Sequence, residues 1–156
     1  MHVSTLLSVT SGIDGAYRVM CRPMLEEFHL QQIPFDILMC LKNHPKVYTA
    51  AQISGLRHLK PSVVSHYVEF LVKEGLLCRQ AVNGDRRKVR LRLTEKAEPI
   101  VVRGQELQLD FYRTMTRGLS EEELQIFRHC VHIAGKNADA IRGGSLGIED
   151  VEEDLC

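Results

Sequence analysis

The chain has no tryptophan and few aromatic residues of any kind, and no apolar run approaches the roughly 18 residues that a membrane-spanning helix needs. Its N-terminal stretch, MHVSTLLSVTSG, lacks the cationic start and the long apolar core of a secretory signal peptide. We therefore expect a cytoplasmic protein that has no membrane partner.

Cysteine pairs are also lacking. The five cysteines are odd in number, widely spaced and free of any CxxC motif, so the sequence predicts neither a disulfide framework nor a metal site, and it indicates no cofactor. Cys40, Cys78 and Cys130 lie on apolar stripes, where a thiol most often packs as a small buried hydrophobic group. Cys21 is a candidate redox residue, because the neighbouring Arg22 could favour its thiolate.

Charge is balanced over the whole chain but not along it. The formal net charge is zero, yet residues 57–96 hold ten Lys/Arg and four Asp/Glu, while the other 116 residues hold ten and sixteen. The local excess of +6 is the electrostatic footprint expected of a region that binds nucleic acid. The alternative is a solvated basic surface without a partner.

Helical periodicity dominates the first 45 residues. Gly12, Gly15 and Pro23 weaken the first predicted helix, and a second helix is expected to begin near Pro34 and to end before Pro45. In the first helix the apolar residues recur every three to four positions, at Leu6, Val9, Ile13, Tyr17, Met20, Met24 and Phe28.

The next segment predicts a helix-turn-helix unit. Thr49 and Gln52 form a capping box that opens a short helix to about Arg57. Residues 58–60 then make a turn, and Pro61 suits the first position of a second helix. That second helix has one apolar stripe, made of Val64, Tyr67, Val68, Leu71 and Val72.

A basic hairpin follows this helix. Gly75 stands where a helix C-cap favours positive φ, and Asn83-Gly84 is typical of a tight turn between two strands. In the second strand apolar residues alternate with cations, which predicts a core face of Val89, Leu91 and Leu93 and a cationic face of Lys88, Arg90 and Arg92. A core-anchored helix beside such a hairpin is typical of proteins that lie on nucleic acid.

Two more helices are predicted after the hairpin. Thr94 is placed to cap a long helix, although Pro99 lies too deep for its first turn and predicts a kink or a late start. Ser120 and Glu123 form another capping box. Terminal helices cannot bury their apolar stripes on a central domain of about 60 residues, which predicts packing against a second copy.

Two segments, KPSVVSHYVEFLVKEGLL and DRRKVRLRLTEKA, make the chain resemble the MarR family of bacterial winged-helix transcription regulators over about residues 15–140. The resemblance implies a mainly α (α+β) fold and a non-enzymatic homodimer that represses transcription at a pseudo-palindromic double-stranded DNA operator. It also implies release by a small aromatic or phenolic effector, as in many members. The expected regions are an N-terminal dimerisation helix (1–33), a winged helix-turn-helix domain (34–96), C-terminal dimerisation helices (97–143) and an acidic mobile tail (144–156).

The resemblance places a first set of DNA contacts on the recognition helix. Lys60 stands where the family often has a capping Ser or Thr, and we expect it to contact a phosphate instead. His58 replaces the glycine of the turn, and histidine tolerates left-handed geometry better than most residues. The expected contacts are Lys60, Ser62, Val63, Ser65 and His66.

A second set belongs to the hairpin, which corresponds to the family's wing. Arg87 resembles the arginine that enters a minor groove in this family, and Asp85 can hold its guanidinium by a bidentate pair. Arg86, Lys88 and Arg90 would then contact phosphates.

The sequence leaves alternatives open for the effector site and for the function. Tyr17, Met20, Met24 and His29 are candidates for an effector pocket, although residues at helical spacing more often pack in a dimer core. The alternative functions are a winged-helix protein–protein interaction module and a regulator that senses oxidants through Cys21. Seven scattered histidines without a glycine-rich phosphate loop offer no enzyme motif.

Overall fold

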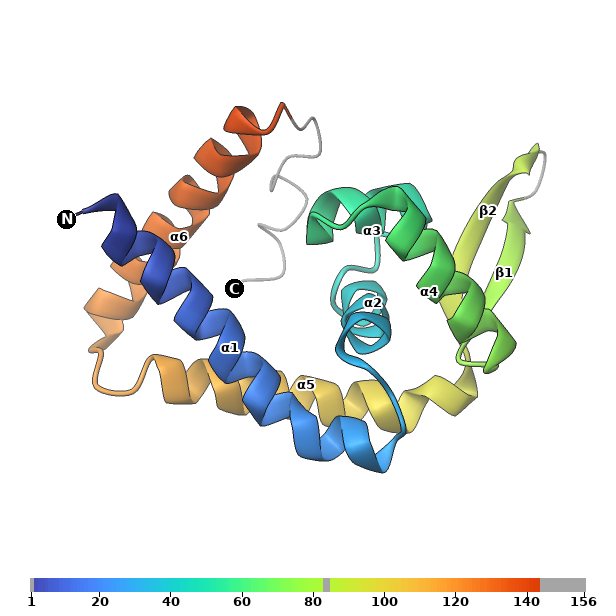
Figure 1. Cartoon of the computed structure of the whole chain (residues 1–156), viewed down its shortest axis with the longest axis horizontal. Coiled ribbons are helices and arrows are strands. Elements are labelled where there is room, and N and C mark those ends of the chain that lie inside the picture. Colours follow the sequence, from blue (N-terminus) through green and yellow to red (C-terminus); the bar gives the residue numbers. More distant parts are fainter. Residues whose placement is uncertain (1, 83–84, 144–156) are drawn as a thin grey trace.

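The computed structural model describes residues 2–82 and 85–143. It is mainly helical with a two-stranded antiparallel sheet, which confirms the predicted fold class (Figure 1). The predicted Asn83-Gly84 turn and the tail at 144–156 lie outside the described residues. In chain order the elements are α1 (Val3–Glu27), α2 (Gln32–Asn43), α3 (Ala50–Arg57), α4 (Pro61–Lys73), β1 (Leu77–Val82), β2 (Asp85–Leu93), the 3₁₀ helix η1 (Glu95–Ala97), α5 (Glu98–Met115) and α6 (Glu121–Ile141).

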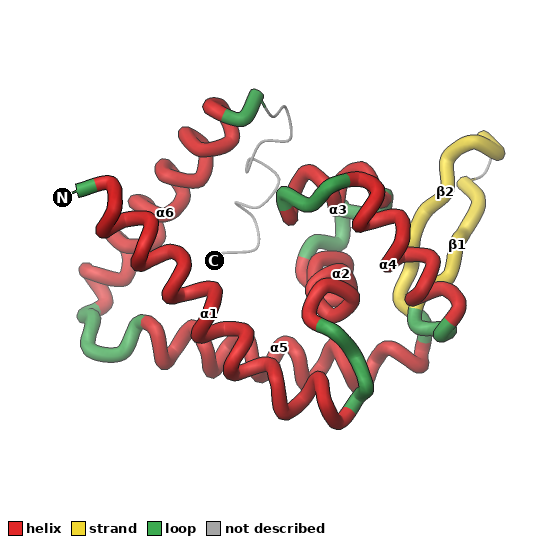
Figure 2. Tube along the Cα trace, viewed as in Figure 1, coloured by secondary structure: helices red, strands yellow, loops and turns green. Residues whose placement is uncertain are grey.

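The helices form a frame around α2. Figure 2 shows α1 and α5 along one side, α4 and the hairpin at one end, and α6 at the other end. Every residue from Pro34 to Leu41 is buried, because α2 packs against α1, α3, α4 and α5 at once. The frame therefore holds the helix-turn-helix unit on one central, mostly apolar helix, whose buried Asp36 pairs with Arg57 of α3.

The close approach of α5 to α2 depends on one glycine. A Cβ atom at Gly104 would collide with the sulfur of Met39 and the ring of Phe35, both on α2. Gly104 is buried, and its missing side chain leaves the space that the Met39 and Phe35 side chains occupy against α5. No pattern in the sequence indicated this role.

The helix-turn-helix unit forms as predicted. Thr49 Oγ1 accepts a hydrogen bond from the Gln52 N–H at 3.2 Å, and Gln52 Oε1 accepts one from the Thr49 N–H at 3.1 Å, which is the expected capping box. His58 adopts the left-handed region with φ 53°, Pro61 begins α4, and Gly75 has φ 71°. These predictions are confirmed because each rests on contacts between near neighbours in the chain.

The hairpin pairs in a register that runs from Leu77 opposite Leu93 to Ala81 opposite Val89, with an irregularity between Ala81 and Val82. The predicted core face is only partly correct. Leu91 is buried, but Val89 is 41% exposed, because the hairpin projects beyond the core at that point (Figure 1).

The start of α5 corrects one prediction and confirms another. Thr94 does not cap the helix; its hydroxyl instead donates to the backbone oxygen of Gly75 at 2.7 Å, which ties the end of β2 to the end of α4. A 3₁₀ turn intervenes, and α5 begins at Glu98 with Pro99 in its first turn, which is the expected late start. The capping box at Ser120 is present as predicted.

Two of the three cysteines expected in the core are exposed. Cys40 is buried, but Cys78 lies on the strand face opposite the buried Leu77, and Cys130 lies on α6, which has no buried residue in the described chain. The assignment of Cys78 and Cys130 to the core was therefore wrong. Alternation along a strand and the lack of a partner for α6 explain the two exposures.

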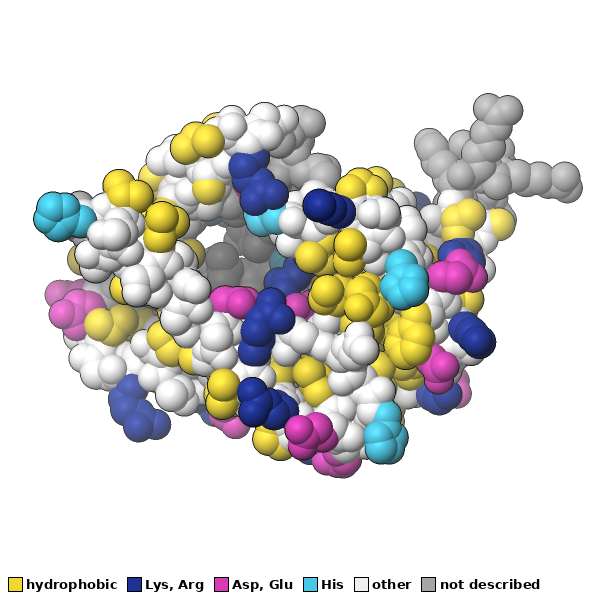
Figure 3. Space-filling view, viewed as in Figure 1, with side chains coloured by type: hydrophobic (Ala, Val, Ile, Leu, Met, Phe, Trp, Pro, Cys, Tyr) yellow, Lys and Arg dark blue, Asp and Glu magenta, His cyan; other side chains and the backbone are white. Residues whose placement is uncertain are grey.

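Apolar residues remain uncovered on the two terminal helices. Figure 3 shows hydrophobic side chains on the outer surface of α6 and of the N-terminal part of α1. The exposed residues of these helices include Val3, Leu6, Leu7, Val9, Ile126, Phe127, Val131 and Ile133. Within residues 2–82 and 85–143, no helix is long and apolar enough to cross a membrane, and no cluster of His, Cys, Asp or Glu is placed to hold a metal ion.

Candidate nucleic-acid interface

The recognition helix α4 is anchored on one face and free on the other. Val64, Val68 and Leu71 are buried, while the predicted contact residues lie at the surface. Lys60 occupies the N-cap with extended backbone and makes no capping bond, which leaves its ammonium available at the start of the helix. Four of them are exposed, namely Lys60, Ser62, Ser65 and His66, and the fifth, Val63, is half-buried.

An ion pair joins α4 to the hairpin. Arg79 of β1 donates to Glu69 of α4 at 2.7 Å, and the Arg79 guanidinium lowers the pKa of the Glu69 carboxyl. The pair crosses from the third turn of α4 to the base of the hairpin. It therefore joins the recognition helix to the hairpin whose second strand carries the predicted wing contacts, and the two lie side by side at one end of the molecule (Figure 1).

The far end of the hairpin carries the expected wing contacts. Asp85 begins β2 opposite Val82, and Arg86, Arg87 and Lys88 follow within the same strand. The side chains of these four residues lie outside the described part of the structure. The Asp85–Arg87 pair and the groove contact of Arg87 consequently stay predictions.

Arg90 has a neighbour that the sequence did not indicate. Its guanidinium carbon lies 4.5 Å from the ring centroid of Tyr48, in the connection between α2 and α3. The Leu91 N–H donates to the backbone oxygen of Tyr48 at 2.8 Å. Together these contacts attach the base of the wing to the segment that leads into the helix-turn-helix unit. The two partners are too far apart in the chain for any local pattern to reveal them.

The four effector-pocket candidates do not share one environment. Tyr17 is half-buried, accepts a hydrogen bond from Gln108 at 2.8 Å, and has its pKa raised by burial, so its phenol stays neutral. Met24 is buried in the core and Met20 is half-buried on the same helix. His29 lies beyond the end of α1, exposed and with φ 53°.

Cys21 does not have the environment of a reactive thiol. It is 0% exposed in the core between α1 and α2, and burial raises its pKa. The expectation that Arg22 favours a Cys21 thiolate is therefore wrong, because Arg22 points to solvent while the thiol is enclosed. A protonated, enclosed thiol is a poor target for oxidants.

Comparison with known proteins places these features in a family context. The sequence profile of the MarR family matches residues 32–89. The HTH-type transcriptional regulator PecS of Dickeya dadantii (strain 3937) is 28% identical over 123 residues, which cover 78% of this chain and 72% of PecS.

Solved structures give the same architecture. A MarR protein from Peptoclostridium difficile superposes with a TM-score of 0.77 at 17% identity, covering 90% of this chain and 91% of that one. The S. aureus MepR–DNA complex superposes with a TM-score of 0.67 at 20% identity, covering 84% of this chain and 94% of the MepR chain. At these identities the similarity shows a shared fold.

Proposed function

We propose that this chain, which belongs to the MarR family of transcriptional regulators, binds a pseudo-palindromic operator in double-stranded DNA as a homodimer and represses transcription there. The observation that carries this proposal is the exposed polar face of α4 beside a basic hairpin, the two being joined by the Arg79–Glu69 pair. Its relative MepR has been crystallised on DNA, which supports the same type of partner for this chain.

The recognition helix is proposed to read bases from the major groove. Residues in the first turns of such a helix reach base edges, and Ser62, Ser65 and His66 stand exposed there. Val63 is suited to contact a thymine methyl group. Lys60, free of any capping role, would contact a phosphate at the entrance of the groove.

The wing is proposed to reach the adjacent minor groove. Arg87 would insert its guanidinium, because a narrow minor groove has a strongly negative potential and a guanidinium is weakly hydrated. Asp85 would orient Arg87 through a bidentate pair. Arg86 and Lys88 would contact flanking phosphates, and Arg90 would do so only by leaving its stack on Tyr48.

A homodimer would cover the apolar surfaces of the terminal helices. Large apolar residues are exposed on both helices in the single chain, among them Leu6 and Leu7 on α1 and Phe127 and Val131 on α6. Extensive apolar exposure usually marks a contact with another protein. A two-fold pair would also place two recognition helices for two operator half-sites. We also propose that the protein acts in the cytoplasm.

We also propose that a small aromatic or phenolic effector releases the protein from DNA, and this part rests on the family resemblance alone. Tyr17, Met20, Met24 and His29 remain the candidate contacts, with Tyr17 and Met24 on the inner side of α1. A protein–protein interaction module is the alternative function, in which the basic hairpin would face an acidic partner. No enzymatic activity is proposed.

Salt dependence of DNA binding tests the proposed function directly. Fragments of genomic DNA that the protein retains would be titrated by fluorescence anisotropy between 50 and 200 mM salt. Each phosphate contact should add about −0.9 to the slope of log affinity against log salt. Absence of any retained fragment, or an affinity that does not change with salt, would overturn the DNA-binding function and favour the interaction module.

A further inference from the structure

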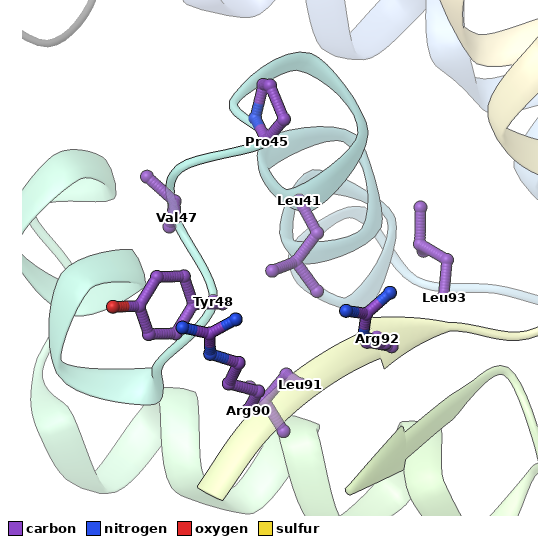
Figure 4. Close-up of a pocket in the computed structure, with 8 residues that line it drawn as sticks. All are labelled: Leu41, Pro45, Val47, Tyr48, Arg90, Leu91, Arg92 and Leu93. Atoms are coloured by element: carbon purple, nitrogen blue, oxygen red, sulfur yellow. The ribbon is translucent and has the colours of Figure 1, made fainter. Parts of the chain in front are cut away.

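A cleft lies along the outer edge of β2, on the side away from β1 (Figure 4). Its volume is about 310 Å³, and its walls come from the end of α2, the α2–α3 connection and β2. This size is close to the lower limit of pockets that hold small molecules, about 300 Å³. The cleft lies wholly within the helix-turn-helix and wing region, apart from α1, α5 and α6.

Arg90 brings a guanidinium group to this cleft. Its guanidinium is stacked on Tyr48, and its Nε atom is enclosed without a hydrogen-bond partner among the described residues. An enclosed donor without an acceptor costs free energy, and native structures satisfy most such groups. Figure 4 shows the two terminal nitrogens of Arg90 on the side of the guanidinium away from β2, and such nitrogens can bind a carboxylate.

A second cation and a backbone amide face the same space. Arg92, two residues along β2, lines the cleft with a second guanidinium. The Leu91 N–H points to the outer edge of the strand, where it meets Tyr48 O. Because alternate residues of an antiparallel strand turn their amides to the same edge, the Leu93 N–H faces that edge too. The carbonyl oxygens of Leu91 and Leu93 share that edge, so the preference of the cleft for an oxyanion rests on the two guanidinium groups.

The remaining wall is apolar. Leu41, Val47 and Leu93 line it, and Figure 4 shows Leu41 and Leu91 between Tyr48 and Arg92. A bare inorganic ion would leave these side chains without a contact. We propose that the cleft binds a small organic carboxylate, whose oxygens accept from Arg90 and Arg92 while its short hydrocarbon part lies on the leucines. This proposal stands whether or not the chain binds DNA.

Titration of the full-length, ¹⁵N-labelled protein with isovalerate tests the proposal by NMR. Isovalerate is expected to cause saturable shifts of the Tyr48, Leu91 and Leu93 amides. Its neutral isostere, isovaleramide, should cause none, and inorganic phosphate should bind more weakly because it lacks the hydrocarbon part. Arg90→Gln should weaken isovalerate binding by about ten-fold or more, the usual scale for a charge-assisted hydrogen bond.

Arg103→Gln is the matched control. Arg103 is also stacked on an aromatic ring, with its guanidinium carbon 5.3 Å from the centroid of Phe28, but it lies on α5 away from the cleft. Its substitution should leave the isovalerate affinity unchanged. Equal binding of isovaleramide, equal or tighter binding of phosphate, or an unchanged affinity in Arg90→Gln would overturn the proposal.

The phosphates of duplex DNA are the other possible source of an oxyanion for Arg90. The same variants distinguish binding of DNA from binding of a carboxylate. If isovalerate causes no saturable shifts while Arg90→Gln weakens binding of duplex DNA, the guanidinium serves the DNA backbone and the carboxylate site is refuted. Failure of the wild-type protein to bind DNA would instead refute the proposed regulator and leave the isovalerate result intact.

Discussion

At the scale of single residues, Arg87 carries the sharpest expectation about DNA. Arg87→Ala should weaken operator binding by about 1–3 kcal/mol, because it removes a guanidinium from the minor groove. Fluorescence anisotropy at fixed salt measures this loss. Arg103→Ala removes a cation that pairs with Glu27 far from the wing and should leave the operator affinity unchanged. An unaltered affinity in Arg87→Ala would refute the minor-groove role.

Gly104 is the residue on which the packing of α5 against α2 depends. Gly104→Ala should lower the free energy of unfolding by about 1–3 kcal/mol, because the added methyl group overpacks the space beside Met39 and Phe35. Urea denaturation measures the change. Gly15→Ala is the control: a Cβ there meets nothing within 4 Å in this chain, and alanine favours a helix. Equal stability of Gly104→Ala and the wild type would contradict the inferred close packing.

At the scale of elements, the Arg79–Glu69 pair sets the charge that α4 presents to DNA. Arg79→Gln would release the Glu69 carboxylate towards the phosphates, and we expect the operator affinity to fall a few-fold. Addition of Glu69→Gln in the same chain should restore the affinity, because the repelling charge is then absent. A loss that the double variant does not restore would mean that Arg79 itself contacts DNA, and titrations of both variants distinguish the two results.

At the scale of the whole molecule, the uncovered face of α6 predicts the assembly. Phe127→Asp combined with Val131→Asp should convert the protein from dimer to monomer in sedimentation experiments, because two buried carboxylates would oppose association. Operator affinity should fall with it, since each half-site would then bind one recognition helix alone. Gln125→Asp, on the opposite side of α6 by helical spacing, should remain dimeric. A double variant that stays dimeric would place the interface elsewhere.

What the sequence determined by itself is local. The capping boxes at Thr49 and Ser120, the left-handed His58, the start of α4 at Pro61 and the turn at Gly75 were all predictable and are confirmed. Each depends on backbone and side-chain groups within about five residues, where bond geometry leaves few choices. The same locality made the recognition-helix surface predictable, because helical spacing divides the buried residues of α4 from the exposed ones.

What only the tertiary structure decided depends on residues distant in the chain. Thr94 lost its expected capping role because the Gly75 oxygen comes within reach of its hydroxyl. Arg90 gained Tyr48 as a neighbour, and with it the cleft beside β2, because the base of β2 lies against the α2–α3 connection. A side chain at Gly104 would clash only because α5 lies against Met39 and Phe35 of α2. Such contacts follow from how the elements pack, and an apolar or basic periodicity specifies which face of an element is buried but not which element covers it.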